Sequence, residues 1–242
     1  YQNKNVLVFG TGTSSHDVSQ DLHANGANVT MVQRSPTMIV NLEPSAQLPY
    51  ALYQEGPSTD DCDLIAISSP LSVLKKTHQI LTKQSKKLDS KLLKKLEKIG
   101  FVLDYGEDNT GWQFKYLTRG GGYYFNVGAS NLVADQKIKL IQFSDIKEFL
   151  SDGIIHNSKK LEYDSFIFAT GYKGQEYMVK KFFGNEVANK VGRIWNFNSK
   201  KQELNNMFVK TNQQGLWFIA GSLAQCRISV SYTHLTLPTN GL

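Results

Sequence analysis

The pattern of apolar and polar positions near the N-terminus predicts a strand, a tight turn, a helix and a second strand. Residues 5–9 form a short apolar run with β-branched and aromatic members, which is typical of a buried parallel strand. Apolar residues then recur at helical spacing until Asn25-Gly26 ends the helix, and residues 28–32 form a second apolar run. A unit of about 30 residues built in this order is a βαβ motif.

The middle of the chain alternates between loop-like and helical composition. Residues 43–60 are rich in Pro, Ser, Glu and Gly and predict a loop, whereas residues 60–100 predict helices. Within the helical stretch we expect Ser90 to be an N-cap and Gly100 to follow a helix C-terminus. Residues 106–122 contain three consecutive glycines and predict a second loop.

The C-terminal half shows the pattern of strands. Short apolar runs at residues 137–141, 146–149 and 153–155 are separated by turn residues, which predicts a meander. Two further apolar runs, at residues 163–168 and 216–220, each end in a glycine-containing turn and predict two more strands.

Lysines between Lys75 and Lys98 concentrate the positive charge of a chain of 242 residues whose net charge is +6. Apolar and basic residues fall on different sides of the predicted helix, so we interpret the lysines as a solvated face. No aromatic residues are interleaved with the lysines, and no nucleic-acid partner is therefore predicted. The apolar side comprises Leu92, Leu93, Leu96 and Ile99, and the other sides carry Lys91, Lys94, Lys95 and Lys98.

Two cysteines, Cys62 and Cys226, are too few and too far apart to indicate a disulfide framework, and neither lies near a histidine cluster that would predict a metal site. We therefore expect a reducing, intracellular compartment, by default the cytoplasm. No apolar run reaches about 18 residues, so no membrane span is predicted, although association with the endoplasmic reticulum membrane and the oligomeric state stay open. The first residue is Tyr1 and no signal segment follows, so we expect the native N-terminus to be missing or processed.

A G-x-G turn lies between the first predicted strand and helix. Gly10 allows the tight turn, and Gly12 lets the backbone approach a pyrophosphate at the helix N-terminus. Ser15 stands where a third glycine or alanine is usual and is small enough for close helix–strand packing. The predicted pyrophosphate-binding residues are Gly10, Thr11, Gly12, Thr13, Ser14 and Ser15.

The end of the second predicted strand indicates which nucleotide binds. An NAD site usually places Asp or Glu there, where it binds the ribose 2′-hydroxyl. This chain has Gln33-Arg34-Ser35 instead, and a guanidinium can hold the 2′-phosphate of NADP through a planar, bidentate contact. These three residues therefore predict NADP(H) rather than NAD(H).

Several segments, taken in order, resemble the flavin-containing monooxygenase family, the class B flavoprotein monooxygenases. The resemblance covers about residues 3–228, and the combination of motifs is specific although each piece alone is not. The segments that carry it are residues 6–17 and 29–37 around the nucleotide motifs, Phe168-Ala169-Thr170-Gly171-Tyr172, residues 115–124, and residues 215–222.

The resemblance implies an NADPH-binding domain inserted into an FAD-binding domain. In this family NADPH reduces FAD, the reduced flavin reacts with O2 to form a flavin hydroperoxide, and this hydroperoxide oxygenates a soft nucleophile (N or S) or a ketone. Thr170, Gly171 and Tyr172 would lie where the NADPH and flavin domains meet. No catalytic acid, base or nucleophile is identified, because the cofactor does the chemistry.

Two features of the family are absent from the chain: the FAD-binding glycine motif and a fingerprint histidine that precedes the NADPH motif. We therefore expect a fragment that is inactive alone. His16 does not replace the missing histidine, because it lies on the first predicted helix, where we expect partial exposure.

The chain ends in a string that the resemblance does not cover. Residues 230–239 match one reading frame of a common sequencing adapter, so we expect residues 230–242 to be a non-native tail, exposed or extended along the surface. The remaining boundaries follow the resemblance. We expect an NADPH-binding domain at residues 1–172 with a helical and loop excursion at residues 43–136, and a partial return to the FAD domain at residues 173–229.

The predicted fold class is α/β, a Rossmann-type NADP-binding domain with a helical insertion and part of an incomplete FAD-binding domain. The predicted function is NADPH binding within an FAD-dependent monooxygenase that acts on a small-molecule substrate and O2. Two alternatives stay open: an NADPH-dependent flavin reductase or disulfide-type oxidoreductase, for which a C-x-x-C would be expected, and a non-catalytic NADP-binding module.

Overall fold

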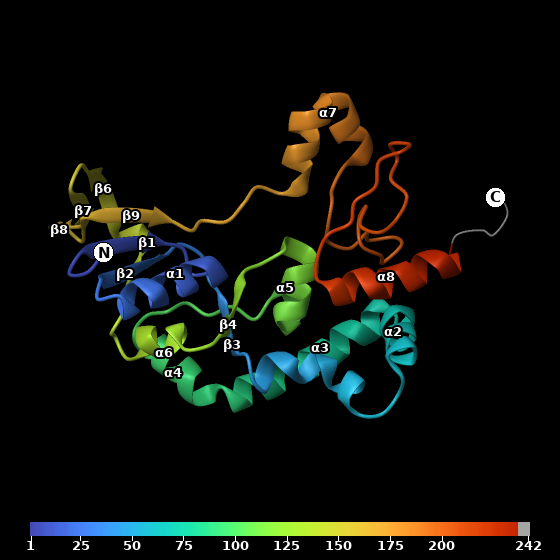
Figure 1. Ribbon diagram of the computed structural model, residues 1–242, viewed down its shortest axis with the longest axis horizontal. Helices are drawn as coiled ribbons and strands as arrows, with labels where there is room; N and C mark the ends of the chain where they lie inside the picture. Colours follow the sequence, from blue (N-terminus) through green and yellow to red (C-terminus); the bar gives the residue numbers. More distant parts are fainter. Residues whose placement is uncertain (237–242) are drawn as a thin grey trace. The chain divides into compact units, whose positions relative to one another are not determined.

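The computed structural model describes residues 1–236 (Figure 1). The chain forms two compact units. The first comprises residues 1–48, 79–115 and 121–171, and the second comprises residues 49–78, 116–120 and the chain from residue 172 onward. No helix among the described residues is long and apolar enough to cross a membrane.

The first unit is built on a four-stranded parallel sheet in the order β5-β2-β1-β9. The strands are β1 (Asn5–Phe9), β2 (Asn28–Gln33), β5 (Lys139–Gln142) and β9 (Ser165–Phe168). Helix α1 (Thr13–Ala24) connects β1 to β2, and Gly26, with a φ of +81°, follows its C-terminus. The predicted βαβ unit and the mixed α/β fold are therefore confirmed.

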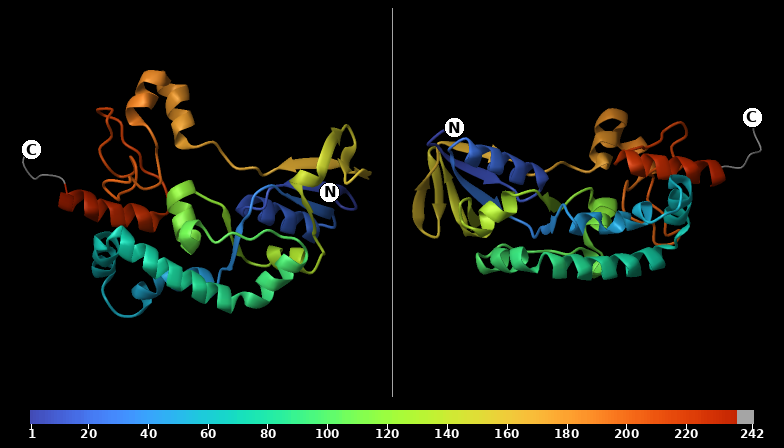
Figure 2. Two further views of the ribbon diagram at one scale, coloured as in Figure 1. Left: turned by 180° about the vertical axis from the view of Figure 1, so that it is seen from behind. Right: turned by 60° about the horizontal axis from the view of Figure 1, so that its bottom comes forward.

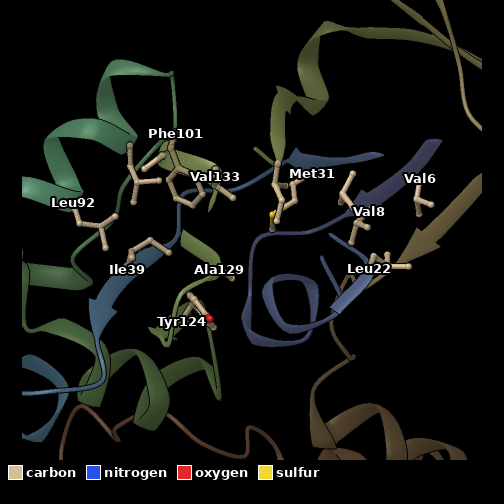
Figure 3. Packing of buried hydrophobic residues seen from close by; sticks show 14 of the residues in the cluster. Val6, Val8, Leu22, Met31, Ile39, Leu92, Phe101, Tyr124, Ala129 and Val133 are labelled. Carbon is tan, nitrogen blue, oxygen red and sulfur yellow. The ribbon is translucent and has the colours of Figure 1, made fainter. Parts of the chain in front are cut away.

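The sheet is buried on both faces, which explains the continuous apolar runs of β1 and β2. Val6, Val8 and Met31 lie on the face covered by α1, α4 (Ser90–Lys98) and α6 (Ala129–Ala134) (Figure 3). On the other face, Leu7 and Phe9 pack with Ile154 of a three-stranded antiparallel meander. That meander comprises β6 (Ile146–Leu150), β7 (Gly153–His156) and β8 (Lys159–Glu162), seen beside the parallel sheet in Figure 2.

The meander is present, with two differences from the prediction. In the run at residues 137–141, residues 139–141 belong to β5 of the parallel sheet, because they pair with β2. Strand β8 was not predicted, because its sequence is mostly charged. Its backbone nevertheless pairs with β7 along its whole length, and its one apolar residue, Leu161, packs against the core.

A second, two-stranded parallel sheet pairs β3 (Met38–Asn41) with β4 (Tyr123–Asn126). Helix α5 (Gly111–Arg119) precedes β4 and follows the short 3-10 helix η2 (Glu107–Asn109). The prediction of a loop at residues 106–122 is therefore wrong. Trp112 and Phe114 are both buried, and that burial stabilises a helix between flanking glycines.

The helical prediction for residues 60–100 is confirmed by α2 (Thr59–Ser68), α3 (Leu71–Leu88) and α4. In α4 the leucines are buried and the lysines exposed, as the pattern predicts. The N-cap is Asp89 rather than Ser90, because the Asp89 carbonyl accepts from the amides of Leu92 and Leu93. Gly100 follows the helix with a φ of +86°. Residues 45–54, predicted as loop, form the 3-10 helix η1 (Ser45–Gln54).

In the second unit, α7 (Gln175–Val191), which is broken at Gly184, packs with irregular segments around Val179, Ile194 and Met207. The strand predicted at residues 216–220 is absent, because no neighbouring strand pairs with it. The segment still alternates: Leu216, Phe218 and Ala220 pack inward, while Trp217 and Ile219 are exposed.

Helix α8 (Leu223–Thr236) ends the described chain. Arg227 on this helix forms a two-point ion pair with Asp63 of α2, at 2.6 and 2.9 Å, and Tyr53 donates to the same carboxylate at 2.8 Å. Because α8 extends to Thr236, residues 230–236 of the predicted non-native tail are helical, and residues 237–242 lie outside the described part of the chain. Their foreign origin stays a prediction.

Candidate functional site

The carboxyl ends of three parallel strands bring most of the predicted nucleotide-binding residues to one edge of the sheet. Phe9, the last residue of β1, pairs with Val32 on one side and with Phe168 on the other. The loops that leave β1, β2 and β9 therefore start side by side. The chain runs from β1 outward through β2 to β5 and returns to β9 beside β1, which is the arrangement in which ligands bind at the strand ends of open α/β sheets.

Gly10 makes the closest backbone approach at this edge. Its φ is +122°, and a Cβ atom there would lie 2.4 Å from the carbonyl oxygen of Ala169. Its amide donates to Val32 at 2.9 Å, and the amide of Ala169 donates to Phe9 at 2.9 Å. Any side chain at residue 10 would force the β1 and β9 loops apart, so glycine is required for the two loops to meet.

Gly12 is different, because a Cβ atom there would meet no atom within 4 Å. It is the N-cap of α1 and provides no side-chain cap. The first amides of a helix have no partners within it, and they carry the positive end of the helix dipole. Thr13 and Ser14 beside it are exposed. The turn therefore leaves an open, electropositive backbone surface that can accept an anion.

The carbonyl of Gly12 is held by three donors from the first turn of α1. The His16 amide donates to it at 3.1 Å, the Ser15 hydroxyl at 2.8 Å, and the His16 Nδ1 atom at 3.0 Å. A carbonyl oxygen only accepts, so Nδ1 carries the hydrogen and His16 is the Nδ1–H tautomer.

His16 is completely buried, and the prediction of partial exposure is wrong. Its ring stacks on Tyr124 of β4, with centroids 4.0 Å apart and an interplanar angle of 9°. Burial lowers the pKa of His16 to about 4, partly offset by the backbone hydrogen bonds, so the ring is neutral at pH 7. Within the described part of the chain, Nε2 is buried without a hydrogen-bond partner.

Thr11 links the glycine turn to the loop after β2. Its hydroxyl lies 2.7 Å from the hydroxyl of Thr37, and the Thr37 hydroxyl lies 3.4 Å from the carbonyl oxygen of Ser35. Both threonines are buried. The Thr11 side chain therefore holds the two candidate phosphate-binding loops together and does not itself face solvent.

Gln33 is buried and uses its amide inside the protein. Its Nε2 atom donates to the carbonyl oxygens of Val102 at 2.9 Å and Ser35 at 3.3 Å, and its Oε1 atom accepts from the amide of Val102 at 2.8 Å. The side chain of Gln142 also donates to Oε1, at 3.1 Å. Gln33 thereby fixes the loop that carries the next two residues.

Arg34 and Ser35 are exposed at the end of β2. Among the described residues, Arg34 forms no ion pair or side-chain hydrogen bond. Its guanidinium is thus available for an anionic ligand. Its role as a 2′-phosphate ligand stays a prediction.

Beyond β9 the chain runs out into solvent. Thr170, Gly171 and Tyr172 are all exposed, and Gly171 has a φ of +84°. Thr170 and Gly171 begin at the same edge as Gly10, whereas Tyr172 belongs to the second unit. No cluster of His, Cys, Asp or Glu side chains in the described chain is arranged to hold a metal ion, and Cys62 and Cys226 are free thiols.

Three residues that shape the site were not among the predicted site residues: His16, Thr37 and Ala169. Helical spacing could have placed His16 on the buried side of α1, three residues before Ser19 and six before Leu22, which are both buried. Nothing in the sequence signals that Thr37 meets Thr11, because this contact depends on the tertiary fold.

Comparison with known proteins adds one sequence relationship. No protein-family model matches the chain. It is 32% identical, over 179 residues, to the probable indole-3-pyruvate monooxygenase YUCCA3 of Arabidopsis thaliana. The match covers 72% of this chain but 35% of that protein, so the chain spans about a third of the length of this curated relative.

Solved structures with a similar arrangement include an oxidized steroid monooxygenase bound to NADP, with 14% identity, a TM-score of 0.48, and coverage of 75% of this chain and 41% of that one. A cyclohexanone monooxygenase mutant from Rhodococcus sp. Phi1 bound to NADP+ shows 13% identity, a TM-score of 0.45, and coverage of 74% and 41%. The sequence relationship shows that this chain is homologous to part of a flavin monooxygenase.

Proposed function

We propose that this chain binds NADPH at the carboxyl edge of β1, β2 and β9, as the nucleotide-binding part of an FAD-dependent monooxygenase. The observation that carries the proposal is the convergence of the Gly10–Gly12 turn, the Arg34 loop and the Thr170-Gly171 segment at that one edge. The homology to part of a flavin monooxygenase, and the motifs that resemble the flavin-containing monooxygenase family, support the same assignment.

The glycine turn fits the pyrophosphate. Space is open above Gly12, so the phosphate oxygens can approach the backbone amides of Thr13 and Ser14 without a side chain between them. The Ser15 side chain is turned inward to Gly12, which leaves the approach clear. The dipole of the 12-residue helix α1 adds favourable charge at the same point.

The loop after β2 fits the ribose 2′-phosphate. Arg34 is exposed and can make a bidentate contact with the phosphate, and Ser35 can add a hydroxyl donor. No acidic residue stands at the end of β2 to bind the 2′-hydroxyl of NAD or to repel the phosphate. In this proposal Gln33 contributes by fixing the loop, since its amide is already engaged within the protein.

In the complete enzyme, FAD would supply the reaction with O2, and the substrate is a small molecule with a soft nucleophilic N or S atom or a ketone. The similarity to a probable indole-3-pyruvate monooxygenase supports oxygenation chemistry. The residues of the first unit would bind NADPH, set its orientation and present its nicotinamide end toward the Thr170-Gly171 segment. We assign FAD binding to the complete protein, because the described residues hold one G-x-G turn between a strand and a helix.

The direct test is calorimetric titration of the purified chain with NADP+ and, separately, NAD+. We expect saturable binding of NADP+ and much weaker binding of NAD+, because only NADP+ carries the 2′-phosphate. Binding of neither nucleotide, or of both equally, would overturn the assignment. In the complete enzyme, incorporation of one oxygen atom from ¹⁸O2 into the product distinguishes a monooxygenase from a reductase, whose product would contain no ¹⁸O.

A further inference from the structure

The Gly12 carbonyl is unusual in receiving two side-chain donors in addition to the ordinary helical bond. Every α-helix begins with an amide-to-carbonyl bond such as the one from His16 to Gly12. Here the Ser15 hydroxyl and the His16 Nδ1–H add bonds of 2.8 and 3.0 Å to the same oxygen. Both side chains are completely buried.

The Gly12 carbonyl belongs to the same peptide unit as the N–H of Thr13, the first residue of α1. A peptide unit is planar and trans, so the C=O of Gly12 and the N–H of Thr13 point in opposite directions. Holding the oxygen toward the first turn of α1 therefore aims the Thr13 N–H away from the helix, beyond its N-terminus.

Resting on the NADPH-binding function proposed above, we infer that His16 and Ser15 are positioning residues that aim the Thr13 amide at the pyrophosphate of the bound nucleotide. Gly12 needs such support because glycine has the most freely rotating backbone of any residue. Two buried donors restrict that peptide before the ligand arrives, so less conformational entropy is lost on binding.

The chemistry of His16 indicates that its Nδ1–H has a use beyond packing. Its stacking on Tyr124 needs only a flat ring, which a phenylalanine would provide. A histidine brings a buried Nε2 atom that has no hydrogen-bond partner within the described residues, and an unsatisfied buried acceptor is destabilising. A histidine at residue 16 despite this cost is explained if the site needs the hydrogen bond from Nδ1–H to the Gly12 carbonyl, which a phenylalanine cannot make.

Two substitutions separate the donor from the ring. His16→Asn keeps a donor, since its Nδ2 atom occupies the place of Nδ1, but removes the stacked ring. His16→Phe keeps the ring and removes the donor. Each variant of the full chain is titrated with NADP+ and with adenosine 2′-monophosphate, which carries the 2′-phosphate but no pyrophosphate, and its unfolding is followed in urea.

We expect His16→Phe to raise the Kd for NADP+ about fivefold, or about 1 kcal/mol, while the Kd for adenosine 2′-monophosphate changes little. His16→Asn should retain the NADP+ affinity although it unfolds at lower urea concentration. If His16 acts in packing alone, His16→Asn should bind NADP+ more weakly than His16→Phe does, and each variant should lose affinity for both ligands to the same extent. That order, or unchanged NADP+ binding in His16→Phe, overturns the inference.

Ser15→Ala tests the same carbonyl if His16→Phe does not fold, because alanine is tolerated in this close-packed position. It should weaken NADP+ binding about two- to threefold and leave adenosine 2′-monophosphate unaffected, as expected for one neutral hydrogen bond. Unchanged NADP+ binding in Ser15→Ala would count against the inference. An unsubstituted chain that binds adenosine 2′-monophosphate and NADP+ upholds the proposed function whatever these variants do. An unsubstituted chain that binds neither overturns the function and the inference together.

Discussion

Arg34→Ala should remove the preference for NADP+ over NAD+ while leaving the fold intact. The guanidinium is exposed and, in the described part of the chain, has no protein partner, so its removal breaks no internal contact. Surface substitutions of this kind change the free energy of unfolding by less than about 0.5 kcal/mol.

The size of the binding effect follows from the contact that is lost. A hydrogen bond to a charged group contributes about 1.5–3 kcal/mol, which corresponds to about 10- to 150-fold in affinity. Arg34 lies on an exposed loop where water competes for the phosphate, so we expect the lower part of this range, about 10- to 30-fold for NADP+. NAD+ lacks the 2′-phosphate, and its affinity should change by no more than about twofold.

The assay is calorimetric titration of both nucleotides into the unsubstituted chain, Arg34→Ala and a matched control. Arg193→Ala is suitable as the control, because Arg193 is also exposed but belongs to the second unit. The control should bind NADP+ as the unsubstituted chain does. The reasoning is refuted if Arg34→Ala binds NADP+ normally, or if it loses NAD+ and NADP+ affinity in equal measure.

Three further outcomes follow from the structure. The folded-state pKa of His16 is about 4, below the ordinary value of 6.5, so the unfolded chain binds the proton more readily than the folded chain. The contribution of neutral His16 to the free energy of unfolding is therefore complete above pH 6.5. It falls by about 3 kcal/mol as the pH drops to 4. Between pH 4 and 6.5, the free energy of unfolding measured in urea should depend less steeply on pH for His16→Phe than for the parent. Some dependence should remain, because burial also lowers the pKa of His78 to about 4. An equal slope for both proteins would contradict the buried, neutral state assigned to His16. Gln33→Leu should lower the free energy of unfolding by about 2 kcal/mol or more and weaken NADP+ binding, because it leaves the amide and carbonyl of Val102 without their partner; a variant as stable as the parent would show that this clamp is unimportant. The chain mixed with FAD and then desalted should be colourless, because the one G-x-G turn between a strand and a helix among the described residues is assigned to NADPH; flavin absorbance retained near one equivalent would contradict this.

The elements that bury their own apolar pattern were predictable from the sequence. Strands β1 and β2 are continuous apolar runs, helix α4 has a periodic apolar face, and helix α1 lies between the glycine turn and Asn25-Gly26, so the sequence indicated where each lies. Elements whose stability comes from distant partners were not. Strands β3 and β4 have four residues each and pair across more than 80 positions of sequence. The glycines on either side of α5 led to the prediction of a loop, although the burial of Trp112 stabilises a helix there.

The candidate site divides in the same way. Position along the chain placed Gly10, Gly12 and Arg34 correctly at the ends of strands, because strand ends are local features. The direction of a side chain depends on tertiary contacts, which is why Gln33 and Thr11 turn out to face inward and His16 turns out to be buried. Local sequence thus indicated where the site lies, but not which side chains hold it in shape.

The most direct test of NADPH binding at this edge is amide chemical-shift mapping by NMR, with NADP+ titrated into the ¹⁵N-labelled chain. Binding as proposed predicts saturable shifts concentrated at Gly10–Ser15, at Arg34-Ser35 and at Thr170-Gly171, with the Thr13 amide among the largest. Few shifts are expected in α7 or around Met207 of the second unit. The absence of shifts at the glycine turn, or saturable shifts confined to the second unit, would contradict the account.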